Sequence, residues 1–192
     1  MQYPGKIRII AGRLRGRVIN VLNETSLRPT PDRVRETLFN WLHPKILQAR
    51  CLDCFSGTGI LGFEALSRGA QQVTMLDRSS SVISALKKTR SDFKIDEAQC
   101  EIMHQDITQW LIMQAAKKGY LPYNIFFLDP PFDTNLLSTT LDLLANHNLL
   151  APDAWVYVEM PVEAASSIPL TGWAPFKSKI AGKVGYHLLA KI

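Results

Sequence analysis

From residue 50 onward, apolar runs of strand length alternate with stretches whose apolar residues repeat at helical spacing. Alternation of this kind predicts an α/β fold with a doubly wound, mostly parallel sheet, because each crossover helix returns the chain to the same end of the sheet. The close of the chain differs, since the strand patterns 177–181 and 184–192 flank Gly182-Lys183 and predict a C-terminal antiparallel hairpin strand. We expect strands near 50–55, 72–77, 100–105, 123–129 and 154–160, and helices near 59–69, 79–94, 107–118 and 134–147.

The first part of the chain follows another pattern. Basic and apolar residues alternate over 6–19 around glycines, which predicts an N-terminal β-hairpin with an arginine-rich turn. A helix signal follows, in which Thr30 can cap the helix and Pro31 suits its first position. We therefore expect a basic hairpin-and-helix extension over 1–49 and a main domain over 50–192.

The net charge of +5 is distributed unevenly. Residues 1–50 hold ten Lys or Arg against three acids, a balance of +7, whereas residues 51–192 hold twelve against fourteen, a balance of −2. Such a concentration is typical of proteins that bind a polyanion, because each neutralised phosphate releases counterions. A solvated basic face without a partner is the alternative. The candidate contact residues are Arg8, Arg13, Arg15, Arg17, Arg28 and Arg33.

The three cysteines, Cys51, Cys54 and Cys100, argue against a disulfide framework and fit a reducing compartment. Cys51 and Cys54 lie inside a strand-like run with no second pair, so packed thiols are favoured over a redox or zinc site. No apolar run reaches the length of a membrane span, and the basic N-terminus lacks the apolar core of a signal peptide. We expect a cytoplasmic protein with no membrane partner and no metal.

A glycine-rich loop connects the first predicted strand of the main domain to its helix. The spacing Gly57-x-Gly59-x-x-Gly62 matches a dinucleotide fingerprint, and Asp77 ends the next strand, where a ribose-binding acid belongs. The pattern predicts a nucleoside ligand on a Rossmann-like fold, and an NAD-dependent oxidoreductase is one alternative. Asp53 favours S-adenosylmethionine instead, because its charge would help an ammonium group and would oppose a pyrophosphate.

Asp106 and Ile107 follow the third predicted strand. Asp106 could accept a hydrogen bond from an adenine amino group, with Ile107 packed against the ring. Asp106 could equally cap the next helix. The two roles can coexist.

The tetrapeptide Asp129-Pro130-Pro131-Phe132 follows the apolar run 123–128. Prolines prevent further ladder pairing, so the carboxylate and the ring are presented at the carboxyl end of the strand, where open α/β sheets bind ligands. An acceptor carboxylate, a stiff turn and a flat ring suit an exocyclic amino group on a planar base. A hydride-transfer site has no evident use for this set, whereas methyl transfer to an amine does.

Together, Asp53 to Gly59, Asp77, Asp106 and Asp129 to Phe132 resemble the class I S-adenosylmethionine-dependent methyltransferases of the amino-methylating branch. The arginine-rich hairpin and the segment Arg28 to Leu42 closely resemble the RsmD family, which are bacterial enzymes that methylate a guanine N2 in small-subunit (16S) ribosomal RNA. The resemblance covers essentially the whole chain. Its implied partner is 16S ribosomal RNA or the small ribosomal subunit, and we expect a monomer.

The resemblance also implies roles for the site residues. Asp129 and the Pro130 carbonyl would accept hydrogen bonds from the target amine, with Pro131 in the same turn and Phe132 stacked on the extruded base. A DNA adenine-N6 or cytosine-N4 methyltransferase and a catalytically silent RNA-binding module remain as alternatives. The implied cofactor-binding residues are Asp53, Phe55, Ser56, Gly57, Thr58, Gly59, Asp77, Arg78, Asp106 and Ile107.

Overall fold

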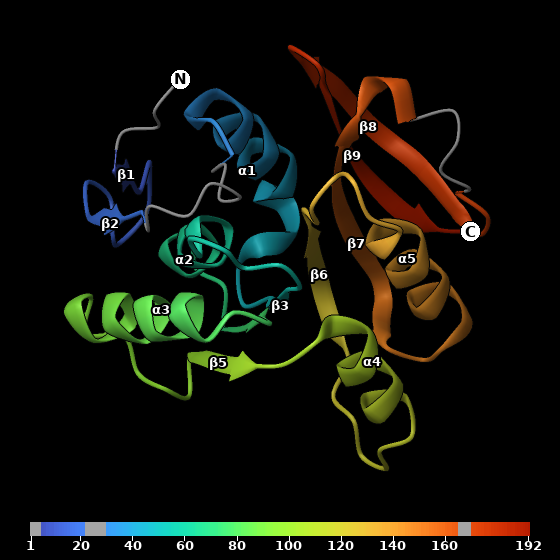
Figure 1. Ribbon diagram of the computed structural model, residues 1–192, viewed down its shortest axis with the longest axis horizontal. Helices are drawn as coiled ribbons and strands as arrows, with labels where there is room; N and C mark the ends of the chain where they lie inside the picture. Colours follow the sequence, from blue (N-terminus) through green and yellow to red (C-terminus); the bar gives the residue numbers. More distant parts are fainter. Residues whose placement is uncertain (1–4, 22–29, 165–169) are drawn as a thin grey trace.

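The computed structural model describes residues 5–21, 30–164 and 170–192. Within these ranges, seven strands form one sheet in the order β5-β4-β3-β6-β7-β9-β8 (Figure 1). Within this sheet β3, β4, β5, β6 and β7 pair in parallel, and β9 is antiparallel to both β7 and β8. This arrangement confirms the predicted Rossmann-like α/β fold with its C-terminal antiparallel hairpin. The strands are β3 (Arg50–Asp53), β4 (Gln72–Asp77), β5 (Cys100–His104), β6 (Tyr123–Leu128), β7 (Leu150–Pro161), β8 (Trp173–Ala181) and β9 (Val184–Lys191).

Helices cover both faces of the sheet. Alternate strand residues point to opposite faces, so Phe127 and Tyr157 are buried in one hydrophobic cluster and Phe126 and Val156 in the other. The first cluster includes apolar residues of α1 (Asp32–Ile46), α2 (Ile60–Ser67) and α3 (Ser80–Asp92). The second includes those of α4 (Ile107–Ala115) and α5 (Leu136–Asn146), and a short 3-10 helix, η1 (Val162–Ala164), follows β7.

The N-terminal hairpin consists of β1 (Lys6–Arg8) paired antiparallel with β2 (Val18–Asn20). Its apolar residues, such as Ile9 and Leu14, are buried in the first cluster. The turn is tied to α2, because Leu14 N donates to Ser67 Oγ at 2.9 Å. The predicted hairpin with an arginine-rich turn is confirmed.

A buried arginine on α1 joins several segments of the N-terminal part. Arg35 is 0% exposed, and its Nη1 lies 3.3 Å from Glu64 Oε2 on α2. Its Nη2 contacts Asp32 Oδ1 at 2.6 Å and the Arg8 carbonyl at 3.1 Å, and its Nε donates to the Thr30 carbonyl at 3.2 Å. One guanidinium therefore links three segments: the hairpin, the loop that precedes α1, and the helix α2.

Glu64 completes this network from the other side. Its two oxygens accept the backbone N–H groups of Ile10 at 2.9 Å and Ala11 at 3.1 Å, and Arg68 Nε at 2.8 Å. Because the network and the first hydrophobic cluster include residues from both parts of the chain, the extension shares its core with the main domain. The division at residue 50 stays a prediction about how the chain is organised.

The start of α1 differs from the sequence-based expectation. The helix begins at Asp32, Pro31 stands just before it, and the helix has no side-chain cap. Thr30 does not cap the helix; its hydroxyl donates to Glu159 Oε1 at 2.9 Å. The prediction of a Thr30 cap is wrong because a buried carboxylate offers the hydroxyl a stronger acceptor.

The hairpin strand β8 begins at Trp173, earlier than the predicted 177. A register shift between Pro175 and Lys177 lets the strand pass the proline. Because β8 lies at the edge of the sheet, the missing N–H of Pro175 costs little.

All three cysteines are buried and free, which confirms the packed thiols. Burial raises the pKa of Cys100 to about 12, and it also raises the pKa of Cys51 and Cys54. Across the described part of the chain, no helix combines the length and the apolar character needed to cross a membrane.

Candidate active site

A cavity of about 400 Å³ opens at the carboxyl ends of the parallel strands. It lies beside the point where β3 and β6 are neighbours and the chain changes direction across the sheet, which is the usual ligand site of such folds. Every predicted catalytic residue lines this cavity, and so does every predicted cofactor-binding residue except Gly59. The structure therefore brings together the two predicted sets in one place.

Gly59 shapes the glycine loop from outside the cavity. It stands just before α2 with φ 75°, and Gly57 has φ 49°, so both occupy the left-handed region that favours glycine. A Cβ on Gly59 would lie 2.4 Å from Leu86 Cδ2 and 2.8 Å from Phe63 Cε2. The left-handed φ and the close packing against α2 and α3 together favour a glycine at this position.

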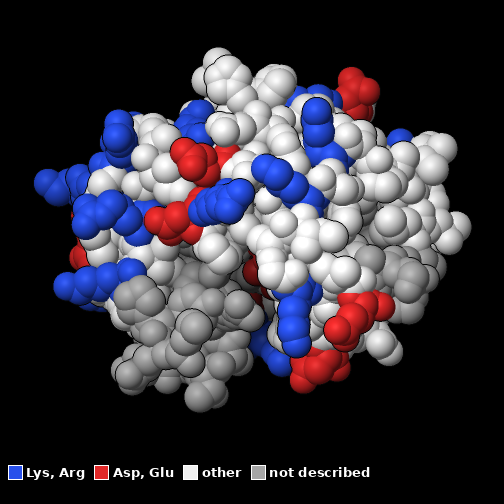
Figure 2. All heavy atoms as spheres, turned by 90° about the horizontal axis from the view of Figure 1, so that it is seen from above, with Lys and Arg blue, Asp and Glu red and all other residues white. Residues whose placement is uncertain are grey.

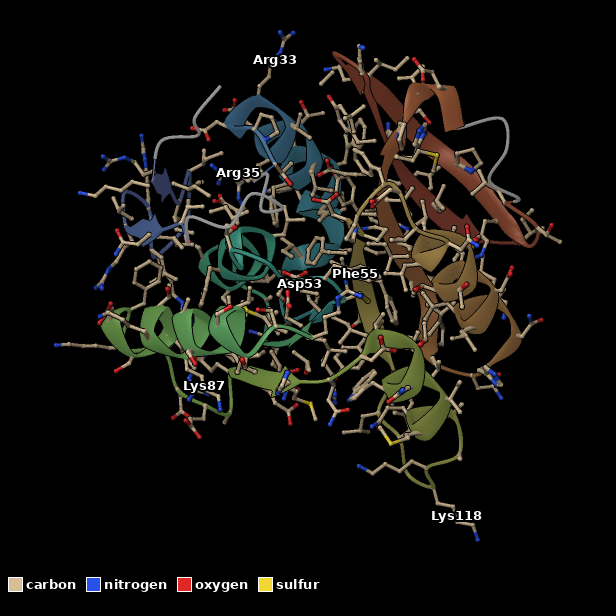
Figure 3. The ribbon with its side chains drawn as sticks, viewed as in Figure 1. Arg33, Arg35, Asp53, Phe55, Lys87 and Lys118 are labelled. Carbon is tan, nitrogen blue, oxygen red and sulfur yellow. The ribbon has the colours of Figure 1, made fainter. Side chains whose placement is uncertain are left out.

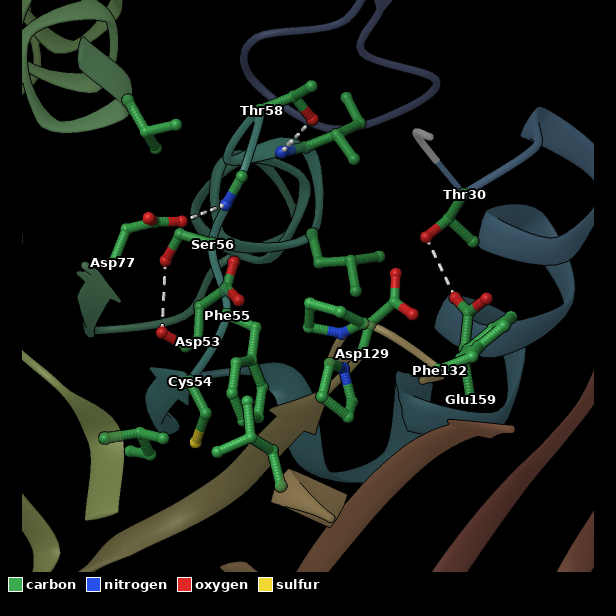
Figure 4. A pocket seen from close by; sticks show the side chains of 18 of the residues that line it. Thr30, Asp53, Cys54, Phe55, Ser56, Thr58, Asp77, Asp129, Phe132 and Glu159 are labelled. Carbon is green, nitrogen blue, oxygen red and sulfur yellow. Dashed lines mark hydrogen bonds between the residues drawn. The ribbon is translucent and has the colours of Figure 1, made fainter. Parts of the chain in front are cut away.

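Asp77 holds the glycine loop against the end of β4. Its Oδ2 accepts the N–H of Gly57 at 3.0 Å, and its Oδ1 accepts the N–H of Ser79 at 2.9 Å (Figure 4). The carboxylate also lines the cavity. An acid in this place suits the predicted contact with ribose hydroxyls, which stays a prediction.

Asp106 caps α4. It accepts the N–H groups of Thr108 at 2.9 Å and Gln109 at 3.1 Å. The hydrogen bond from the Thr108 hydroxyl, followed by those from the two backbone N–H groups, lowers the pKa of this carboxyl against the opposing effect of burial. The capping alternative is confirmed, and because Asp106 and Ile107 also line the cavity, the adenine contact stays a prediction.

Three carboxylates from neighbouring strands line one side of the cavity: Asp53, Asp129 and Glu159. Asp53 is 3% exposed; burial raises its pKa to about 7 although Oδ2 accepts the Gly62 N–H at 3.2 Å. Burial, then Glu159 and Asp53, raise the pKa of Asp129, which Figure 4 shows between those two acids. Acids that raise one another's pKa favour a cationic ligand, whose charge would offset the cost of their burial.

Glu159 is a site residue that the sequence reasoning missed. It lies within the predicted strand 154–160, near its end, and is 6% exposed, with Oε1 accepting the hydroxyls of Thr30 at 2.9 Å and Tyr157 at 2.8 Å. Because the predicted strand that contains Glu159 ends at the same edge of the sheet as Asp129, the sequence could have indicated Glu159 as a site residue. Tyr186 of β9 also lines the cavity, and no motif in the sequence marked it.

The Asp-Pro-Pro-Phe turn places its aromatic ring at the cavity mouth. Phe132 is 45% exposed, whereas Pro130 is buried. The Thr134 hydroxyl donates to the Pro131 carbonyl at 2.7 Å and closes the turn. An exposed ring on a stiff turn is available to stack on a planar group.

The candidate arginines lie on the surface, and none of those described lines the cavity. In Figure 2, Lys and Arg gather at the left of the face, where Figure 1 places β1 and β2. Arg33 extends outward from α1 in Figure 3, in contrast to the buried Arg35. Arg28 lies outside the described residues. Of the candidate arginines, the exposed ones are Arg8, Arg13, Arg15, Arg17 and Arg33.

Two turn arginines also make contacts within the protein. Arg13 Nη2 donates to Gln99 Oε1 at 3.1 Å. Arg17 Nη1 donates to the Asp92 carbonyl at 3.0 Å, and its guanidinium lies 5.5 Å from the centroid of the Phe93 ring. These contacts orient the guanidinium groups while the side chains stay exposed.

The sheet order, the acid-lined cavity and the Asp-Pro-Pro-Phe turn define a Rossmann-like methyltransferase. A family model described as "Conserved hypothetical protein 95" matches residues 7–190. The chain belongs to this family, the RsmD family.

Relatives of known name support this assignment. The chain is 45% identical over 184 residues to Ribosomal RNA small subunit methyltransferase D of Haemophilus influenzae, covering 96% of this chain and 93% of that protein. It is 44% identical over 184 residues to the protein of the same name from Escherichia coli K12, covering 96% and 89%. A solved structure described as a putative methyltransferase from Escherichia coli has a TM-score of 0.85 and 41% identity, covering 97% of this chain and 98% of that one.

Proposed function

We propose that this protein transfers the methyl group of S-adenosylmethionine to the exocyclic N2 amine of a guanine in 16S ribosomal RNA, on a small-subunit particle. The observation that carries the proposal is the Asp129–Phe132 turn, which places an acceptor carboxylate and an exposed ring at the mouth of an acid-lined cavity. Relatives named small-subunit ribosomal RNA methyltransferases support the substrate class.

The residues of the cavity fit S-adenosylmethionine. The ligand is a cation at its sulfonium and ammonium groups, and Asp53, Asp129 and Glu159 line this side of the cavity, where burial and the neighbouring acids raise the pKa of Asp53 and of Asp129. A pyrophosphate would add negative charge there, which disfavours NAD. Asp53 and the loop up to Thr58 would hold the methionine part, Asp77 the ribose, and Asp106 with Ile107 the adenine. When bound, S-adenosylmethionine supplies an electrophilic methyl group on sulfur.

The residues of the Asp-Pro-Pro-Phe turn would prepare the amine. Guanine N2 is a poor nucleophile because its lone pair is conjugated with the ring. Hydrogen bonds accepted by Asp129 and the Pro130 carbonyl draw the nitrogen toward tetrahedral geometry and return that electron density for in-line attack. Phe132 would stack on the extruded base, whose unstacking costs a few kcal/mol.

Asp129 would also take the proton that the amine releases after methyl transfer. Burial and the neighbouring acids raise the pKa of its carboxyl, so it holds a proton more readily than an exposed aspartate does. Water is the other acceptor.

The direct test incubates the protein with radiolabelled S-adenosylmethionine and one of three acceptors: unmodified 16S ribosomal RNA, unmodified small-subunit particles, or duplex DNA. We expect label in the particle, with the modified base mapped as N2-methylguanine. Label in DNA at adenine or cytosine would favour the DNA amino methyltransferase alternative. Binding of RNA without label in any acceptor would favour the catalytically silent module.

Cofactor affinity should fall as the pH falls below about 7. The pKa of Asp53 is about 7 in the ligand-free protein, so at lower pH the cationic ligand must displace a proton. Linkage to one proton weakens binding by up to about tenfold for each pH unit below that value. Calorimetric titration with S-adenosylmethionine from about pH 5.5 to pH 8 measures this, with Asp53→Asn expected to bind weakly and with a flatter pH profile.

A lower pH, which weakens cofactor binding through Asp53, should raise the stability of the ligand-free protein through the same carboxyl. Because its folded pKa is raised above the ordinary value of 3.8, the folded state binds the extra proton, and stability falls as pH rises from about 4 to about 7. The thermal shift caused by S-adenosylmethionine should be larger at pH 8 than at pH 6, because the cofactor is expected to bind more tightly at pH 8. A shift that does not depend on pH would remove Asp53 as the titrating group.

Replacing Arg13, Arg15 and Arg17 together by alanine should weaken RNA binding and leave cofactor affinity unchanged. Each lost phosphate contact is expected to reduce the slope of log affinity against log salt by about 0.7 to 0.9. The matched control replaces the exposed Lys87, Lys117 and Lys118; in Figure 3 Lys87 lies below α3 and Lys118 lies beyond α4, whereas the β1–β2 hairpin lies above α3. Equal effects of the two triple variants would mean that total charge, rather than the hairpin, governs binding.

A further inference from the structure

We propose that a second RNA-binding surface extends from the cavity mouth across α1 and the β8–β9 hairpin, and that it takes the single-stranded RNA next to the target nucleotide. The proposal rests on the proposed function. We refer to it as the aromatic-basic surface, and it is formed by Trp41, Lys45, Trp155, Phe176, Lys177 and Lys179.

The aromatic-basic surface begins at the cavity itself. Tyr186 lines the cavity, and its ring is stacked on Trp41 with the centroids 5.5 Å apart and the planes at 29°. Tyr186 is buried, whereas Trp41 is only partly buried against the first hydrophobic cluster. The first group outside the cavity on this side is therefore an aromatic ring that nucleic acid could reach.

The surface continues one helical turn further along α1. Lys45 follows Trp41 by four residues, so the two side chains are neighbours on the helix. Its Nζ lies 4.9 Å from the centroid of the Trp155 ring, and Trp155 in turn lies 5.0 Å from Phe176. Phe176 is 41% exposed, which leaves a ring available for stacking.

Strand register places two further lysines on the same face. Lys179 is paired with Tyr186, and Lys177 is paired with Leu188. Residues directly opposite each other in an antiparallel pair point to the same face. Both lysines therefore lie on the α1 side of the sheet, and both are exposed. Ser178 points to the other face, where its hydroxyl and His187 Nδ1 are 2.8 Å apart.

Rings interleaved with lysines match the chemistry of single-stranded nucleic acid. Bases stack on aromatic rings, and the phosphates between them pair with positive charges. Charge complementarity and continuity with the cavity thus select RNA as the occupant. In Figure 1 the β8–β9 hairpin and the β1–β2 hairpin lie on opposite sides of α1, so RNA would be held on both sides of this helix.

Lysine on an edge strand often serves only to prevent edge-to-edge pairing. The test separates the two roles with Lys177→Ala/Lys179→Ala and, independently, Phe176→Ala. The matched control is Lys117→Ala/Lys118→Ala, two exposed lysines beyond α4; Lys118 is labelled in Figure 3, far from the β8–β9 hairpin. The probe is a fluorescent single-stranded RNA of about 12 nucleotides with one central guanine, a length within the range that single-strand sites cover.

Anisotropy titrations at several salt concentrations measure the effect. The double lysine variant should lower the salt slope by about 1.4, because each single-strand phosphate contact contributes about 0.7. Phe176→Ala should weaken binding by about fivefold or more at an unchanged salt slope, because it removes stacking and no charge. The control pair should change neither quantity, and all variants should bind S-adenosylmethionine as the unmodified protein does.

Unchanged affinity and slope in both test variants would overturn the aromatic-basic surface. Aggregation of the lysine variant with normal RNA affinity, seen by light scattering, would do the same and assign the lysines to edge protection. If the protein methylates ribosomal RNA but does not bind the oligonucleotide, the proposed function stands and the aromatic-basic surface is rejected. If the protein binds the oligonucleotide through these residues but methylates no RNA, the aromatic-basic surface stands and the proposed function is rejected.

Discussion

Replacing Asp129 by alanine is expected to lower the rate constant of methyl transfer by about 100-fold or more, while the affinity for S-adenosylmethionine changes only a few-fold. The carboxylate lies at the carboxyl end of β6, in the turn that presents Phe132 at the cavity mouth. In the proposed mechanism, its removal takes away the main acceptor for the amine hydrogens and a nearby acceptor for the released proton. Single-turnover incorporation of labelled methyl and calorimetric titration with S-adenosylmethionine measure the two effects separately.

Two further variants sharpen this test. Asp129→Asn keeps one acceptor oxygen for the amine but cannot accept the released proton. Its loss of rate should therefore be smaller than that of Asp129→Ala, which removes both functions. Asp133→Ala removes an exposed acid four residues later and serves as the matched control. If cofactor affinity fell in step with the rate in Asp129→Ala, the residue would belong to the cofactor site rather than to the amine site.

Replacing Arg35 by alanine is expected to destabilise the protein by about 3–5 kcal/mol. The guanidinium is 0% exposed and bonds Glu64, Asp32 and two backbone carbonyls. Its removal leaves the 0% exposed Glu64 carboxylate with Arg68 as its remaining ion-pair partner among the described residues, and it leaves the Arg8 and Thr30 carbonyls without this donor. Urea unfolding followed by circular dichroism gives the change in the free energy of unfolding.

The controls for Arg35 come from the same helix. Arg33→Ala removes an exposed arginine two residues earlier and should change stability by less than about 0.5 kcal/mol. Arg35→Lys should restore little, because one ammonium group cannot reach acceptors that surround a planar fork on several sides. A loss below about 1 kcal/mol in Arg35→Ala would mean that water enters the site of the lost guanidinium at little cost.

Much of the site followed from local patterns. Asp53, Asp77, Asp106 and Asp129 each end or follow an apolar strand pattern, and parallel strands place their carboxyl ends at one edge of the sheet. Their meeting around one cavity was therefore predictable once the strands were recognised. The arginine-rich hairpin was predictable for the same reason, because alternation and glycines are local signals.

Other features could not be predicted, because they depend on contacts between distant segments. The hydroxyl of Thr30 bonds Glu159, and that partner overrode the capping role that the local sequence suggested. The buried pairing of Arg35 with Glu64 is equally non-local, since arginine on a helix is usually exposed.

By itself, the sequence determined the order of strands and helices, the acids that end the strands, and the basic character of the first 50 residues, since periodicity and composition are properties of neighbouring residues. Only the tertiary structure decided that β9 lies between β7 and β8. That pairing brings Tyr186 to the cavity and sets Lys177 and Lys179 on the same face as α1. The reason is physical: strand register and the packing of one helix against a sheet edge depend on how distant apolar surfaces fit together, and no local pattern records that fit.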